Sequence, residues 1–328
     1  MIRRREFITV LGSAAAAWPV VARAQQAPVP VIGFLGTTSG ADWTPLVDAF
    51  RYGLRDVGYM EGQNLAIEYR WAEGQFDQLP AMTADLIARA VSVIVTTGSA
   101  NSTRAAVAAT STIPIVFVIG TDPVRLGLVA SFNRPGGNVT GVSWLAAALG
   151  TKQLQLLSEL LPDASTIGML VNSANPVTAS ELKEVQEAAR VLKRNVLGLN
   201  VGDKREIDPA FETLVQQRAS ALLVSSDPLF LTQREQVIEL ARRHEIQAIY
   251  PVREYAAAGG LISYGTRLAD AYHQVGVYTG RILGGAKPAE LPVQQAAKIE
   301  LVINLGTAKA LGLTIPANLI ALADEVIE

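Results

Sequence analysis

Short apolar segments alternate with longer amphipathic segments along most of this chain, and this alternation limits its fold more than any other feature. A short apolar run bounded by turn residues is typical of a buried strand, whereas apolar residues three and four positions apart are typical of a helix. We predict strands over 31–35, 65–71, 91–96, 114–119, 166–171, 196–201, 221–224, 248–251 and 261–264. We predict helices over 43–57, 79–90, 100–109, 149–161, 179–192, 207–217, 231–244 and 269–283.

Strands that alternate with helices of roughly 10–15 residues form parallel sheets, because each helix carries the chain back over the sheet in a right-handed crossover. The chain has 328 residues, which exceeds one typical domain of about 150 residues. The turn-rich segment 133–138 interrupts the alternation, and we expect 139–149 to cross to a second unit. The predicted fold is therefore α/β, with two doubly wound parallel-sheet lobes.

The first 24 residues have the pattern of an export signal. Arg3, Arg4 and Arg5 form a positively charged start, 8–17 is apolar, and 22–24 (ARA) fits a small-x-small cleavage site. The run 4–8 (RREFI) fits a twin-arginine signal. The apolar part is shorter than the roughly 20 residues that span a bilayer, so we expect cleavage near Ala24 rather than an uncleaved anchor. The mature protein is then expected in the periplasm.

The composition excludes several classes of function. The net charge is −2 at pH 7, with 28 basic and 30 acidic residues, which gives no electrostatic footprint for nucleic acid. The absence of cysteine excludes disulfides, thiolate metal sites, a catalytic thiol and a lipoprotein anchor. His244 and His273 are too few for most zinc sites, and GxGxxG, GxxxxGK[ST] and GxSxG are all missing. We therefore expect no metal, no cofactor and no enzyme activity.

Small polar residues follow several of the predicted strands, at the edge where open parallel sheets bind their ligands. The set comprises Thr37, Ser39, Thr97, Gly98, Ser99, Asn101, Asp122, Asn175 and Asp227. The start of the helix after Ser99 suits a carboxylate, because backbone N–H groups and the helix dipole favour negative charge there. Asp122 and Asp227 suit an ammonium group. The alternative for each of these residues is an ordinary helix cap.

Aromatic residues near the expected cleft are candidates for packing against a ligand. Trp144 lies at the expected first crossing, where it would touch a ligand from the hinge side, and the alternative is a tryptophan that only packs the hinge. The same set includes Trp43, Tyr250, Tyr255 and Tyr264.

Several motifs in one order give the chain a family resemblance. They are 58–65 (GYMEGQNL), 121–124 (TDPV), 134–141 (RPGGNVTG), 286–293 (AKPAELPV) and 304–316 (NLGTAKALGLTIP). Together they resemble the ABC transporter substrate-binding family that includes the tryptophan- and tyrosine-binding lipoproteins of Gram-positive bacteria. The resemblance covers nearly the whole chain after residue 24.

The resemblance implies a type I periplasmic binding fold, in which two lobes are joined by three hinge crossings. One lobe would then contain 25–143 with about 266–290, and the other 144–265 with about 291–328. Residues 97–101 would hold a carboxylate, Asp122 and Asp227 would lie near an ammonium group, and Trp144, Tyr250 and Tyr264 would pack on the ligand side chain.

The expected function is that of an exported solute-binding protein of an ABC importer, which closes around a small polar ligand at its hinge. The ligand would be an amino acid or a related carboxylate, with an aromatic side chain as one option. The expected partners are this ligand and a membrane permease, without nucleic acid, and the protein is expected to be a monomer. The alternative is an exported ligand sensor that passes its signal to another protein.

Overall fold

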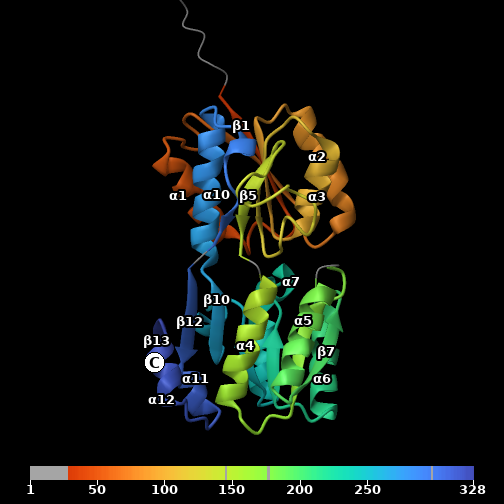
Figure 1. The fold of residues 1–328 in the computed structure, drawn as a ribbon, viewed down its shortest axis with the longest axis vertical. Coiled ribbons are helices and arrows are strands. Elements are labelled where there is room, and N and C mark those ends of the chain that lie inside the picture. Colours follow the sequence, from red (N-terminus) through yellow and green to blue (C-terminus); the bar gives the residue numbers. More distant parts are fainter. Residues whose placement is uncertain (1–28, 145, 176–177, 297) are drawn as a thin grey trace, which may run out of the picture.

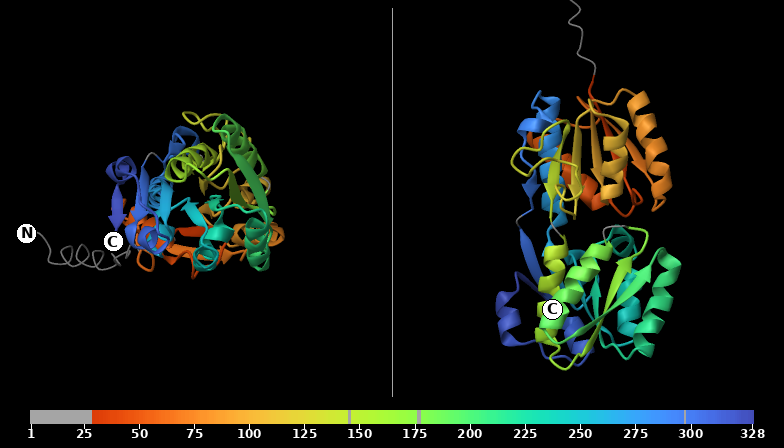
Figure 2. Two further views of the ribbon diagram at one scale, coloured as in Figure 1. Left: turned by 90° about the horizontal axis from the view of Figure 1, so that it is seen from below. Right: turned by 45° about the vertical axis from the view of Figure 1, so that its right-hand side comes forward.

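The computed structural model describes residues 29–144, 146–175, 178–296 and 298–328. The predicted signal peptide, residues 1–24, lies outside the described residues. The chain forms two α/β lobes stacked along the long axis of the molecule, and segments from three places in the sequence pass between them (Figures 1 and 2). Within the described ranges, no helix combines the length and apolarity that crossing a membrane requires.

The N-terminal lobe is built on a six-stranded sheet in which every paired strand runs parallel to its neighbour. Its strands are β1 (Val31–Gly36), β2 (Ala66–Trp71), β3 (Val93–Thr97), β4 (Ile115–Ile119), β5 (Val139–Ser143) and β11 (Gln294–Gln295). Their order across the sheet is β11-β5-β4-β3-β1-β2. Helices α2 (Leu79–Ala88) and α3 (Ala100–Ala109) cover one face, and α1 (Thr44–Asp56) and α10 (Leu268–Leu283) cover the other (Figure 1).

The C-terminal lobe is built on a seven-stranded sheet with one antiparallel pair, β10 and β12. Its strands are β6 (Thr166–Asn172), β7 (Asn195–Val201), β8 (Ala221–Val224), β9 (Gln247–Tyr250), β10 (Ile262–Thr266), β12 (Ile299–Asn304) and β13 (Glu325–Ile327), in the order β13-β12-β10-β9-β8-β6-β7. Its helices are α4 (Ala146–Leu160), α5 (Thr178–Val191), α6 (Ile207–Gln216), α7 (Pro228–Thr232), α8 (Arg234–Arg243), α9 (Arg253–Ala257), α11 (Leu305–Ala310) and α12 (Ala317–Leu322). The predicted fold class, two doubly wound lobes, is confirmed.

Both sheets are buried on both faces, as parallel sheets covered by helices must be. In β4, the side chains of Val116 and Val118 pack toward α1 and α10, while Ile115, Phe117 and Ile119 pack on the opposite face. The apolar cluster under α1 and α10 continues across the space between the lobes into the cluster under α6 and α8. The two lobes therefore touch through apolar side chains as well as through the crossings.

The sheet pairing places the three crossings between β5 and α4, between β10 and α10, and between β11 and β12. Two sequence expectations are corrected here. Residues 139–143 are not part of the first crossing, because they form β5, which pairs with β4 inside the N-terminal lobe. The third crossing also lies later than the boundary near 291, because Gln294 and Gln295 still pair with β5.

The segment 231–244 is also not one helix, since α7 ends at Thr232 and α8 begins at Arg234. The strands β12 and β13 at the end of the chain were not predicted, and neither was the antiparallel pair that β12 forms.

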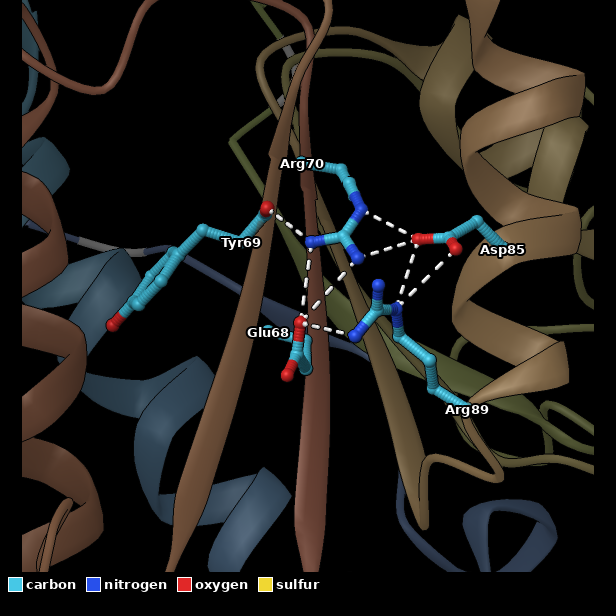
Figure 3. Close-up of polar contacts among 5 residues, drawn as sticks. All are labelled: Glu68, Tyr69, Arg70, Asp85 and Arg89. Carbon is cyan, nitrogen blue, oxygen red and sulfur yellow. Dashed lines mark hydrogen bonds and ion pairs between the residues drawn. The ribbon is translucent and has the colours of Figure 1, made fainter.

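Charged side chains cover the exposed edge strand β2 (Figure 3). Arg70 Nε donates to Asp85 Oδ2 at 2.7 Å, and its Nη1 lies 3.3 Å from Glu68 Oε2. Arg89 contacts the same two carboxylates at 3.1 and 3.5 Å, and the Arg70 guanidinium above all holds the pKa of Asp85 below its usual range. Charges on an edge strand hinder pairing with another chain, and these half-exposed pairs contribute little to stability.

Helices α1 and α10 approach each other closely through two glycines. A Cβ atom on Gly53 would lie 1.9 Å from the carbonyl oxygen of His273, and one on Gly276 would lie 2.1 Å from that of Phe50. No side chain larger than hydrogen fits at either place without moving backbone. Because α10 follows the second crossing, this contact fixes the returning chain to the N-terminal lobe.

Candidate ligand cleft

A narrow cavity lies between the lobes, where the carboxyl ends of strands from both sheets face each other. Its volume is about 20 Å³, far below the roughly 300–1,000 Å³ typical of small-molecule sites, so its walls lie close together. The lining residues are Trp43, Gly98, Trp144, Ser226, Asp227, Pro228, Leu231, Pro251, Val252, Leu268 and Tyr272.

Two buried aromatic residues form the N-terminal wall. Trp43 directly precedes α1 and Tyr272 lies in the second turn of α10, and the Trp43 indole Nε1 donates to the Tyr272 hydroxyl at 2.5 Å. Burial raises the pKa of Tyr272 to about 12, against the hydrogen bonds from Trp43, Thr97 and the Gly98 backbone, which lower it. The hydroxyl therefore stays neutral, and the bond between two distant segments fixes both rings.

Threonine hydroxyls gather just beyond the strands of this lobe. The Oγ1 atoms of Thr37, Thr38 and Thr121 are buried and have no hydrogen-bond partner among the described residues. Gly98, with φ of +88°, brings the chain against Thr37, since a Cβ there would lie 2.1 Å from its Oγ1. Leaving a buried polar group unpaired costs about 1–3 kcal/mol, so a polar ligand group that reached these atoms would recover that cost.

The first turn of α3 lies beside Gly98. Ser99 is the cap of this helix, because its Oγ accepts the Asn101 N–H at 3.2 Å. The Ser102 hydroxyl donates to the carbonyl oxygens of Thr97 and Ser99 at 3.0 and 2.8 Å. These bonds hold the start of a ten-residue helix rigidly at the cleft, with its positive end toward the space between the lobes.

Asp227 belongs to the C-terminal wall and is 4% exposed. Its Oδ1 accepts from Asn172 Nδ2 and from the Leu229 N–H, each at 2.9 Å, and its Oδ2 accepts from Asn175 Nδ2 at 2.8 Å. Burial raises the pKa of Asp227, and these hydrogen bonds act in the opposite direction. A carboxylate offers about four acceptor positions, so Asp227 both caps α7 and keeps capacity toward the cavity.

A second buried acid, Glu181 on α5, lies behind this wall and was not predicted from the sequence. It is 7% exposed. Burial, followed by the negative charge of Asp227, raises the pKa of Glu181 to about 7, against a hydrogen bond from the Ser226 backbone. The sequence signal was misleading here, because Thr178 and Glu181 match the spacing of a capping box.

The matching family model describes ABC transporter substrate binding proteins and covers residues 28–327. The chain belongs to the ABC transporter substrate-binding protein family. The resemblance predicted from the sequence motifs is thereby confirmed, and a substrate-binding protein of this family binds a small molecule and works with an ABC permease. It is not an enzyme.

Among similar proteins is a tyrosine-binding protein of Clostridioides difficile strain R20291, 28% identical over 262 residues, which are 80% of this chain and 75% of the relative. A structure of a conserved domain protein from Vibrio cholerae is 26% identical with a TM-score of 0.84. A Streptococcus pneumoniae ABC domain in complex with L-Trp is 27% identical with a TM-score of 0.82. Each structural alignment covers 91% of this chain and 99% of the other.

In this substrate-binding protein, the predicted site residues fall into three groups. Gly98, Trp144 and Asp227 line the cavity. Thr37, Thr97, Ser99, Asn101 and Asn175 lie directly behind that wall, through the contacts described above. Their part in binding stays a prediction.

The remaining predicted residues have other neighbours. Ser39 donates to Asp42 Oδ2 at 2.5 Å, and Asp122 Oδ1 accepts the backbone N–H groups of Val124 and Arg125 at 2.8 and 3.2 Å. Tyr250 is buried and stacks on Tyr255 at a centroid distance of 4.6 Å.

Tyr264 packs against the C-terminal core, and its carbonyl oxygen accepts from Gln153 at 2.7 Å. Neither Tyr250 nor Tyr264 is among the lining residues of the cavity. Tyr272 and Leu268, which do line it, were missed because α10 reaches the cleft only after the second crossing. Leu231 was missed because the sequence placed it at the start of a longer helix, 231–244.

One ion pair joins the rims of the two lobes. Arg125 follows β4 in the N-terminal lobe, and its Nη1 lies 3.2 Å from Glu184 Oε1 on α5 of the C-terminal lobe. Both side chains are partly exposed, at 67% and 38%. The pair therefore bridges the cleft from the outside.

Proposed function

We propose that this substrate-binding protein captures an aromatic amino acid between its lobes for an ABC importer. The observation that carries the proposal is the distribution of groups around the cavity. Much of its lining is aromatic and aliphatic, from Trp43, Trp144, Tyr272, Leu231 and Leu268. Its N-terminal side has Gly98 and the start of α3, and its C-terminal side has the acid Asp227.

These three parts match the three parts of such a ligand. The carboxylate fits the α3 start and the Thr37 hydroxyl, because both offer hydrogen-bond donors and the helix dipole favours an anion. The ammonium group fits Asp227, and the ring fits between the tryptophans. The tyrosine-binding relative and the structure in complex with L-Trp support the same ligand class.

A closing motion at the hinge would complete the site, since each lobe supplies only part of the wall. A ligand that contacts both lobes stabilises the closed form by its differential affinity for that form. The closed protein would then present a surface that the permease recognises.

We also propose export through the twin-arginine signal, so changing Arg4 and Arg5 to Lys should leave the protein in the cytoplasmic fraction of its cell.

The ligand proposal is tested by calorimetric titration and thermal shift of the purified protein with L-tryptophan, L-tyrosine and L-phenylalanine. A ligand at 100 times its Kd adds about 2.7 kcal/mol to stability. We expect binding of at least one of the three, and no binding of L-alanine, which lacks the ring. If none of the aromatic amino acids binds while another solute class does, the proposed ligand is wrong although the family assignment stands.

A further inference from the structure

Two buried carboxyl groups lie next to each other on the C-terminal side of the cleft, and only one is explained by the ligand contacts proposed above. Asp227 faces the cavity, whereas Glu181 lies behind it on α5. Thr178, in the same first turn of α5, donates to the carbonyl oxygens of Asn172 and Asn175 at 2.6 and 2.9 Å, and both asparagines donate from Nδ2 to Asp227. The two acids are therefore connected through the cavity wall itself.

The surroundings of Glu181 contain no compensating base among the described residues. The charged groups that act on it are Asp227, from the loop after β8, and Glu184, from its own helix, and both are acidic. Arg125 approaches from the other lobe but pairs with Glu184. On the side of α4, a Cβ atom placed on Gly150 would lie 3.8 Å from Glu181 Oε1.

Such an arrangement is costly when both acids are ionised, because two like charges then share one buried region. The Ser225 Oγ atom in the same loop is also buried without a hydrogen-bond partner among the described residues. One positive charge placed in the cavity beside Asp227 would offset the repulsion between the two carboxylates. It would neutralise one carboxylate and allow the other to ionise.

We infer that Glu181 is a positioning residue of the cleft that makes it select ligands carrying a positive charge, because Glu181 gives up its proton to solvent when such a ligand binds. This inference rests on the proposed function. Before binding, Asp227 is ionised and Glu181 is protonated. After binding, both are ionised, the ammonium group of the ligand balances one of them, and one proton has left.

Selectivity follows from this exchange. An aromatic carboxylate without an ammonium group supplies no positive charge, so it leaves Glu181 protonated and gains nothing from Asp227. Because the pKa of Glu181 is about 7, the exchange falls in the physiological pH range. As pH rises toward 7, the affinity for a ligand with an ammonium group should increase by up to about tenfold per pH unit. Above pH 7 the affinity should level off.

The test is calorimetric titration of the full protein with L-tryptophan at pH 6 and pH 8, each in two buffers of different ionisation enthalpy. We expect release of about one proton per L-tryptophan at pH 6 and a small fraction at pH 8. Indole-3-propionate, which keeps the ring and carboxylate but lacks the ammonium group, should bind weakly and release none. This comparison needs no variant.

Glu181→Gln should abolish the proton release and flatten the pH profile of L-tryptophan affinity, since Gln keeps the acceptor for the Ser226 N–H. Glu187→Gln, at an exposed position of the same helix, should behave like the unchanged protein. Binding of L-tryptophan without proton release, or with equal release in Glu181→Gln, overturns the inference and leaves the proposed function intact. Failure of both L-tryptophan and L-tyrosine to bind overturns the proposed function and this inference with it.

Discussion

Glu181 links the stability of the empty protein to pH. Its pKa in the folded protein is about 7, above the value of 4.5 that it has when exposed. The native state therefore binds more protons than the unfolded state between pH 4.5 and pH 7, and stability falls as pH rises through this window. At 1.36 kcal/mol per unit, this loss amounts to up to about 3 kcal/mol.

Glu181→Gln should remove this loss. We expect the variant to be as stable as the unchanged protein at pH 4, where Glu181 is protonated in both states, and more stable at pH 8. The measurement is urea unfolding at both pH values without ligand. Equal free energies of unfolding at pH 8 would mean that Glu181 does not carry a buried charge there.

Removing the unpaired hydroxyl of Thr37 should weaken ligand binding without destabilising the empty protein. Thr37→Val removes a buried group that has no partner among the described residues, so the empty protein should be equally or more stable. If Thr37 donates to the ligand carboxylate, Kd for L-tryptophan should rise about fivefold, the value of one hydrogen bond.

Thr83→Val is the matched control for this change. Thr83 is buried in α2, where its hydroxyl already donates to the Leu79 carbonyl oxygen at 2.8 Å, away from the cavity. It should leave ligand affinity unchanged. A similar loss of affinity in both variants would show that the effect of Thr37→Val comes from altered packing.

Single residues were predictable where local spacing decides their place. Gly98 and Asp227 follow predicted strands. Because open parallel sheets bind ligands at the carboxyl ends of their strands, both residues were expected at the cleft. The same spacing predicted caps, and Ser99 and Asp227 are caps. Tyr272 could not be found in this way, because its position depends on how α10 returns over a lobe formed more than 200 residues earlier.

At the scale of elements, the helix pair α1 and α10 makes a sharp prediction. Gly276→Ala places a methyl group where the Phe50 carbonyl oxygen lies only 2.1 Å away, so the helices must separate. Overpacking of this kind typically costs about 1–3 kcal/mol, and backbone on the far side cannot rotate away as a side chain can. We expect a loss at or above the upper end, measured by urea unfolding.

Gly284→Ala, at the end of the same helix, is the control. A Cβ there would meet its nearest atom at 3.4 Å, and the residue has an ordinary φ of −79°. It should change stability by less than about 1 kcal/mol. If the two variants were equally stable, the close contact between α1 and α10 would be doubtful.

Most elements of the first two thirds of the chain were predicted, because most strands there are short apolar runs, whereas β5 was expected to be part of a crossing. The end of the chain behaves differently for physical reasons. β11 has two glutamines and no apolar pattern. β13 has three residues and pairs with β12, whose other partner, β10, runs antiparallel. Their pairing depends on contacts between distant segments, which periodicity does not contain.

At the scale of the whole molecule, the sequence indicated two lobes but not where the chain returns between them. Sheet pairing decides this, since β11 adds to the first sheet and β12 to the second. Between these sheets the cavity is narrow, and the Arg125–Glu184 pair joins the rims. This pair can exist only while the lobes are close together, so it should favour the closed form.

Arg125→Ala should therefore weaken ligand binding without changing the stability of either lobe. Exposed ion pairs contribute about 0.2–1 kcal/mol, so Kd for L-tryptophan should rise by up to about fivefold, mainly through faster dissociation. The difference should shrink as salt is added, because the pair is exposed. Stopped-flow fluorescence at low and high salt measures both effects. Arg205→Ala is the control, because Arg205 pairs with Asp203 inside the C-terminal lobe.

A double-mutant cycle assigns the effect to the pair itself. Glu184→Gln alone should weaken binding to a similar degree, and adding Arg125→Ala to it should cause little further loss, because the partner is already gone. Additive losses would mean that Arg125 acts on the ligand or on the hinge by another route. No loss in either single variant at low salt would mean that closure depends on the apolar walls and the ligand alone.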